Sequence, residues 1–295
     1  MTRDAGHDTG IMSAPAPALK FPGRIGLGTW KMGAARAAQA SEIAAVSHAL
    51  ATGYRLIDTA EMYGDGGAEK IIGTALQGFG VARRPELFIV SKVLPGNASR
   101  AGTIRACEAS IARMGCDYLD LFLLHWRGAQ PFRETLRAFQ DLRQRGLVRH
   151  FGVSNFDVDD LSVWLETERA LGIEPGMACN QLFYCLEARA IDFSQLAWQR
   201  KQRIQTMAYS PLGQGSLARH PTLQQIGRAR GISAAQVALA WAIREPDVVA
   251  IPKSVHPARI EENLAAAQVQ LSAAELTMLD RSFPPPRSRQ TLPTT

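Results

Sequence analysis

The sequence lacks any run of about 18 consecutive apolar residues, which is the length needed for a membrane-spanning helix. Residues 1–18 mix proline, alanine, glycine and charged residues, and they lack the continuous apolar core of a secretory signal peptide. We therefore expect a protein that neither crosses a membrane nor is secreted. We also expect residues 1–18 to form a flexible extension.

Cysteine and histidine are both scarce. The four cysteines lack the paired spacing of a zinc site and lie within helix-like or strand-like runs, so we expect reduced, mostly buried thiols in the cytoplasm. Of the six histidines, only His125 ends a strand-like run. A metal-dependent barrel hydrolase needs clustered histidine and carboxylate ligands, so that function ranks last and no metal site is expected.

The charge shows only a modest basic excess. The 33 basic and 27 acidic residues give a net charge of +6, and the sequence contains no basic run flanked by aromatic residues. This distribution argues against nucleic-acid binding and suits an anionic small ligand better.

Short apolar strands alternate with helix-patterned segments along the whole chain. A doubly wound sheet would also alternate, but its phosphate-binding turn normally has the spacing G-x-G-x-x-G, which GLGTWKMG (26–33) does not fit. We therefore predict a single (β/α)8 TIM barrel over residues 19–283, with short extra helices and a short C-terminal tail over residues 284–295. The expected strands lie near 25–30, 55–60, 87–92, 118–124, 148–153, 177–182, 204–209 and 248–251. The expected helices lie near 41–53, 67–78, 100–114, 132–145, 157–169, 187–202, 233–244 and 257–267.

Four titratable residues arrive at the ends of successive strands. Asp58 and Tyr63 come from GYRLIDTAEMYG (53–64), Lys92 ends LFIVSK, and His125 ends YLDLFLLH. Each alone has an ordinary explanation, such as a turn cap, a core aromatic residue or a solvated lysine. In a barrel, however, reactive side chains gather at the C-terminal ends of the strands.

This combination resembles the aldo-keto reductase family, whose members carry an Asp, Tyr, Lys, His tetrad after these same strands. The similarity runs from about residue 21 to 283. The resemblance implies that Tyr63 is the general acid, that Lys92 paired with Asp58 lowers the pKa of its phenol, and that His125 donates to the carbonyl oxygen and orients it.

Further motifs lie at later strand ends, in HFGVSNF (150–156), ACNQLFY (178–184) and AYSPLGQG (208–215). Amides can hydrogen-bond a carboxamide and a phenol can stack on a flat heterocycle, as a nicotinamide requires. In IPKSVHPARIEEN (251–263), the resemblance implies that Lys253, Ser254 and Arg259 grip the 2′-phosphate of NADPH, and that Glu262 and Asn263 bind adenine. The complete set of implied cofactor contacts is Thr29, Trp30, Asp58, Ser154, Asn155, Gln181, Tyr209, Ser210, Leu212, Gln214, Lys253, Ser254, Arg259, Glu262 and Asn263.

The substrate pocket is expected between Trp30, Tyr63, His125 and Trp126. The proline-rich tail differs from the long specificity loop of many animal family members and is too short to wrap a large ligand. Together with MYGDGGAEKIIG (62–73), it looks more like bacterial members that reduce small aldehydes such as methylglyoxal.

The resemblance therefore implies NADPH-dependent reduction of aldehydes and dicarbonyls to alcohols by hydride transfer, with a tyrosine general acid. The expected partner is a small-molecule carbonyl substrate, and we expect a cytoplasmic monomer. The alternative is a cofactor-binding, redox-sensing or regulatory subunit on the same fold with little turnover.

Overall fold

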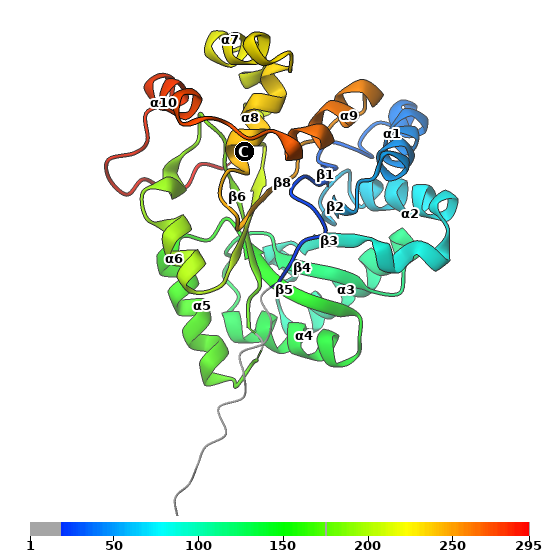
Figure 1. Ribbon diagram of the computed structural model, residues 1–295. Coiled ribbons are helices and arrows are strands. Elements are labelled where there is room, and N and C mark those ends of the chain that lie inside the picture. The colour runs from blue at the N-terminus through cyan, green and yellow to red at the C-terminus, as the bar shows by residue number, and fades with distance from the viewer. Residues whose placement is uncertain (1–18, 175, 295) are drawn as a thin grey trace, which may run out of the picture.

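The computed structural model describes residues 19–174 and 176–294, and its centre is one sheet of eight parallel strands in sequential order (Figure 1). The strands are β1 (Leu27–Gly28), β2 (Leu56–Asp58), β3 (Phe88–Val93), β4 (Leu119–Leu124), β5 (Val148–Ser154), β6 (Cys179–Phe183), β7 (Gln205–Tyr209) and β8 (Val248–Ala250). The expected extension over residues 1–18 lies outside the described residues.

The sheet curls until its last strand meets the segment entering its first. Ile25 and Ala250 form a parallel bridge, and the Ala250 amide donates to the Arg24 carbonyl at 2.9 Å. On the other side of the same residue, the Gly26 amide donates to the Ala250 carbonyl at 2.8 Å. These bonds close the predicted (β/α)8 barrel.

Ten α-helices surround the strands within the described residues. They are α1 (Gln39–Thr52), α2 (Gly67–Phe79), α3 (Arg100–Met114), α4 (Phe132–Gln144), α5 (Val158–Ala170), α6 (Gln195–Lys201), α7 (Pro221–Arg230), α8 (Ala234–Ala242), α9 (Pro257–Ala265) and α10 (Ala273–Ser282). Among the described residues, no helix is both long and apolar enough to cross a membrane.

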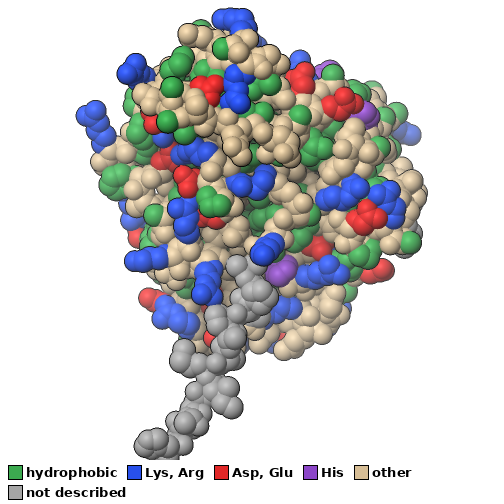
Figure 2. Space-filling view, viewed as in Figure 1, with side chains coloured by type: hydrophobic (Ala, Val, Ile, Leu, Met, Phe, Trp, Pro, Cys, Tyr) green, Lys and Arg blue, Asp and Glu red, His purple; other side chains and the backbone are tan. Residues whose placement is uncertain are grey.

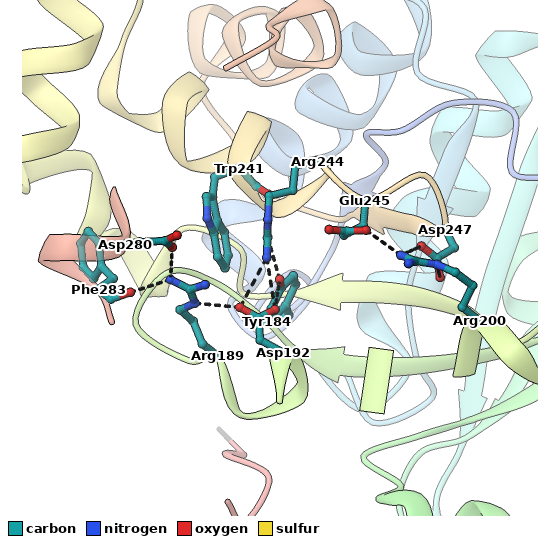
Figure 3. A network of polar contacts seen from close by, with 10 residues as sticks. All are labelled: Tyr184, Arg189, Asp192, Arg200, Trp241, Arg244, Glu245, Asp247, Asp280 and Phe283. Carbon is teal, nitrogen blue, oxygen red and sulfur yellow. Dashed lines mark hydrogen bonds and ion pairs between the residues drawn. The ribbon is translucent and has the colours of Figure 1, made fainter. Parts of the chain in front are cut away.

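The helix predicted over residues 187–202 is wrong in its first half, where only a single 3₁₀ turn forms before α6. A network of polar contacts occupies this segment instead (Figure 3). Arg189 pairs with Asp192 at 2.7 Å, and Arg244 donates to the Tyr184 hydroxyl at 2.7 Å. Both guanidinium groups also lie against the Trp241 ring, that of Arg189 at 5.0 Å and that of Arg244 at 4.0 Å from its centroid. These contacts tie the β6–α6 segment to α8.

The short extra helices α7 and α10, which the sequence predicts without placing, begin at recognisable signals. Pro221 occupies the first turn of α7, where its missing N–H costs no hydrogen bond. At α10, Ser272 and Glu275 form a reciprocal capping box.

Side-chain alternation along the strands positions the site. An apolar cluster fills the barrel interior, and it includes Leu56, Val90, Leu123, Cys179 and Met207. Because side chains on one face of a strand repeat every second residue, the next inward positions toward the C-terminal ends follow directly. They are Asp58, Lys92, His125, Gln181 and Tyr209.

The surface carries charges of both signs. Figure 2 shows basic side chains interspersed with acidic ones over the visible face, without one continuous basic patch. Several charged side chains of the described residues form ion pairs, including Arg100 with Asp141 and Arg200 with Asp247.

Candidate active site

A buried lysine, Lys92, connects two of the other predicted catalytic groups, Asp58 and Tyr63. The Lys92 ammonium donates to Asp58 Oδ2 at 2.9 Å, to the Thr59 carbonyl at 2.8 Å and to the Tyr63 hydroxyl at 3.1 Å. Lys92 is 0% exposed, Asp58 2% and Tyr63 8%. The cation therefore lies directly between a carboxylate and a phenol, shielded from water.

The Asp58 carboxylate is also held from its other side. Gln181 donates through Nε2 to Asp58 Oδ1 at 2.7 Å, so both carboxylate oxygens are hydrogen-bonded. Beneath it, the Thr29 hydroxyl donates to the Asp58 carbonyl at 2.9 Å. Residues of β3 and β6, and the residue that follows β1, thus converge on Asp58 at the end of β2.

The environment opposes the predicted lowering of the Tyr63 pKa. Burial raises the pKa of Tyr63 above its ordinary value, and the nearby charge of Lys92 only partly reverses this. Burial would lower the pKa of Lys92, but Asp58 and Tyr63 together raise it above its ordinary value. At neutral pH the site therefore holds a protonated phenol beside a protonated amine.

His125 lies next to Tyr63 with a ring-centroid distance of 5.9 Å in an edge-on arrangement. Burial, followed by the charge of Lys92, lowers the pKa of His125 to about 2, so the imidazole is neutral. Its Nδ1 is buried and has no hydrogen-bond partner among the described residues. An unsatisfied buried acceptor is less costly than an unsatisfied N–H, so the proton belongs on Nε2.

A cavity of about 1080 Å³ opens in front of these groups. A hydrogen-bonded chain forms part of its wall: the Tyr209 hydroxyl donates to Asn155 Oδ1 at 2.9 Å, and Asn155 Nδ2 donates to Ser154 Oγ at 3.1 Å. Asn155 also donates to the His125 carbonyl at 3.1 Å. The predicted amide and aromatic contacts are therefore linked to the tetrad.

Most residues predicted from the sequence line this one cavity. They are Trp30, Asp58, Tyr63, His125, Trp126, Ser154, Asn155, Gln181, Tyr209, Ser210, Leu212, Gln214, Lys253, Ser254, Arg259, Glu262 and Asn263. Among the described residues, Thr29 and Lys92 lie behind the cavity wall. Thr29 is 0% exposed and its hydroxyl holds the backbone of Asp58, which supports an anchoring role; the cofactor contact expected of it stays a prediction.

Sequence reasoning missed several lining residues. Lys31 and Arg127 directly follow the predicted wall residues Trp30 and Trp126, and this adjacency is the signal that could have identified them. Thr294 comes from the C-terminal tail, which folds back to the cavity and which the sequence did not place. The other missed polar residues include Arg219, Ser233 and His256.

Unusual backbone conformations concentrate around the cavity. Six described non-glycine residues have positive φ, and four of them line it. Such conformations cost free energy and are frequent at ligand-binding sites. The four are Lys31, Asn155, Ser210 and Gln214.

Within residues 19–174 and 176–294, no group of three or more histidine, cysteine, aspartate or glutamate residues is arranged to hold a metal ion.

The family model described as "Aldo/keto reductase family" matches residues 24–283. The chain belongs to the aldo/keto reductase family. Methylglyoxal reductase YeaE of Escherichia coli is 44% identical over 276 residues, covering 91% of this chain and 93% of that protein. Glyoxal reductase of Bacillus subtilis is 37% identical over 256 residues, covering 87% of each chain.

A solved structure supports the same assignment. An aldo-keto reductase from Klebsiella pneumoniae, crystallised in complex with NADPH, matches with a TM-score of 0.85 and 41% sequence identity. The match covers 92% of this chain and 95% of that one. The cavity that Asp58, Tyr63 and His125 line is therefore the candidate catalytic centre.

The lowered pKa of His125 predicts a pH-dependent loss of stability. Because the folded-state pKa is about 2, below the ordinary value of 6.5, the unfolded chain binds a proton that the folded chain excludes at intermediate pH. Stability should therefore fall as the pH drops below about 6.5. We expect this group to remove about 2 kcal/mol of unfolding free energy between pH 7 and 5.

Urea unfolding of the wild type and His125→Gln at both pH values measures this contribution. The variant should lose about 2 kcal/mol less than the wild type over the same interval. Equal losses in the two proteins would show that His125 does not titrate differently on folding.

Proposed function

We propose that the chain catalyses NADPH-dependent reduction of aldehydes and dicarbonyls to alcohols, with Tyr63 as the general acid. One observation carries the proposal: the buried Lys92 ammonium donates to the Tyr63 hydroxyl at 3.1 Å, and that hydroxyl group borders a large cavity. This arrangement provides a proton donor together with a cation that stabilises the donor after it has lost its proton.

The residues present fit NADPH. The cavity is large, and amide and aromatic side chains line it near the tetrad. The residues that follow β8 add the positively charged side chains of Lys253 and Arg259 to its wall. Lys253, Ser254 and Arg259 would hold the 2′-phosphate, and Glu262 and Asn263 the adenine. Ser154, Asn155, Gln181 and Tyr209 would hold the nicotinamide, and when bound the cofactor supplies the hydride. The NADPH complex of the Klebsiella relative supports this choice.

The chain's own residues manage the proton. The raised pKa keeps the Tyr63 phenol protonated, so the proton is available for the carbonyl oxygen as negative charge develops there. Lys92 then stabilises the phenolate, and Asp58 keeps Lys92 protonated and in place. The Nε2–H of neutral His125 donates to the same carbonyl oxygen and orients it.

The cavity walls and the relatives support a small carbonyl substrate. Trp30, Met62 and Trp126 contribute apolar surface to the cavity, and the two relatives are named for methylglyoxal and glyoxal. An apolar wall discriminates weakly between substrates, because one methylene group is worth only about 1–3 kcal/mol. We therefore propose a broad range of small aldehydes and dicarbonyls, with aldehydes reduced faster than ketones. We also propose a cytoplasmic monomer, which the four unpaired cysteines suit.

Tyr63→Phe removes the proposed proton donor but keeps the ring. Turnover of methylglyoxal should fall by about 10²- to 10⁴-fold, while NADPH binding, measured by fluorescence titration, stays close to wild type. Near-normal turnover would remove Tyr63 from the mechanism. A wild-type protein that binds NADPH and reduces no carbonyl tested would favour the regulatory alternative.

Arg259→Ala tests the phosphate contact. One charge-assisted hydrogen bond contributes roughly 1.5–3 kcal/mol, so NADPH affinity should fall by about 10- to 200-fold, while NADH affinity changes little. Glu262→Gln is the matched comparison on the same helix. Because both cofactors contain adenine, that change should affect NADPH and NADH alike. Equal weakening of both cofactors in Arg259→Ala would mean that Arg259 does not recognise the phosphate.

A further inference from the structure

The C-terminal tail, residues 284–294, follows α10 and contains no helix or strand (Figure 1, red). Its starting point is fixed, because Arg189 donates to the Phe283 carbonyl and pairs with Asp280 at 2.7 Å (Figure 3). The Phe283 ring also packs against His220, with ring centroids 4.5 Å apart. The tail therefore leaves the barrel from a well-held position.

The tail then returns to the start of α5, where an ion pair holds it. Arg289 donates to Asp159 Oδ2 at 2.7 Å and Oδ1 at 3.1 Å, and to Asp157 Oδ2 at 3.1 Å. Asp157 is the N-cap of α5, and its other oxygen accepts from the amides of Asp159 and Asp160. Leu292, three residues beyond Arg289, is partly buried against the main hydrophobic core.

The held tail forms a wall between two cavities. A second cavity of about 530 Å³ lies between the tail and the start of α5, and Arg289 lines it. Asn155 and Thr294 line both this cavity and the main one. If the tail moved away, the second cavity would therefore open into the main cavity next to Asn155.

We propose that Arg289 determines the size of carbonyl compound that the site accepts, by holding the tail against α5 as the outer wall of the substrate pocket. This inference rests on the proposed function. Arg289 acts as a positioning residue, since it lines the second cavity and is absent from the described lining of the main one. With the ion pair formed, Thr294 bounds the pocket. With the ion pair broken, a larger group can extend into the second cavity.

The exposure of the ion pair makes the wall easy to open. The Arg289 side chain is 51% exposed, and those of Asp157 and Asp159 are 41% and 74% exposed. Exposed pairs are weak and are screened by salt, so a fraction of molecules has an open tail at any moment. Because the ion pair is weak, removing it increases the fraction of molecules with an open tail only modestly. The expected change in activity is therefore only a few-fold.

The test compares Arg289→Ala and Asp159→Asn with Arg287→Ala. Asp159→Asn removes the charge that accepts two of the three Arg289 contacts and leaves the Asp157 cap intact. Arg287→Ala removes the same charge from the same tail, at a residue with no ion-pair partner among the described residues. The kcat/KM for pyrenecarboxaldehyde, a bulky aldehyde, should rise about two- to fivefold in the first two variants and stay unchanged in the control. The kcat/KM for methylglyoxal should stay within about twofold of wild type in all three.

A second measurement reports on the tail independently of activity. Trypsin cleavage after Arg287, followed by intact mass, should be a few-fold faster in Asp159→Asn and Arg289→Ala than in the wild type. Adding 1 M salt (a Debye length of about 3 Å) should accelerate cleavage of the wild type and have little effect on Arg289→Ala, which has lost both ion pairs.

The outcomes separate the two proposals. Faster cleavage with unchanged selectivity between the two aldehydes would overturn the inference, because the tail would then be held without limiting substrate size. Unchanged cleavage in both variants would also overturn it. If the wild type reduces neither aldehyde, the proposed function fails, and the cleavage rates still show whether Arg289 holds the tail.

Discussion

The site depends on a lysine and an aspartate that pair inside the barrel, away from water. Burying either charge alone would be strongly unfavourable, and the pair persists because each group is also hydrogen-bonded by others. Lys92 donates to a backbone carbonyl and to Tyr63, and Asp58 accepts from Gln181. These bonds come from strands far apart in the sequence, so the barrel must close before the pair can form.

The same pair supports the role proposed for Tyr63. Burial favours the neutral phenol, and the adjacent ammonium stabilises the anion that remains once the proton has been transferred. A group that remains protonated at rest, yet loses its proton readily when a neighbouring oxygen becomes negative, has the properties of a general acid. His125 contributes a neutral donor, because burial and Lys92 both oppose its protonation.

Much of this could be predicted from the sequence because β-strands have a period of two. Leu56, Val90 and Leu123 occupy the barrel interior, and the polar residues two positions later must share their face at the open end. Thr29 shows the limit: strand position alone does not distinguish a cavity residue from one that supports a neighbour's backbone. Lys92 does lower the pKa of Tyr63, as predicted, but the larger opposing effect of burial could not be read from the sequence, and the net pKa is raised. The tail could not be placed at all, since the Arg289 contacts join residues 130 and 132 positions apart.

The most direct measurement of the central claim, that Lys92 acts through Tyr63, is a double-mutant cycle on single-turnover reduction of methylglyoxal at saturating NADPH. The cycle compares the wild type, Lys92→Met, Tyr63→Phe and the double variant. If Lys92 acts through Tyr63, the double variant should be about as slow as the slower single variant, because groups that act as a unit have non-additive effects. Losses that multiply in the double variant would mean that the two residues contribute independently, and would contradict this account.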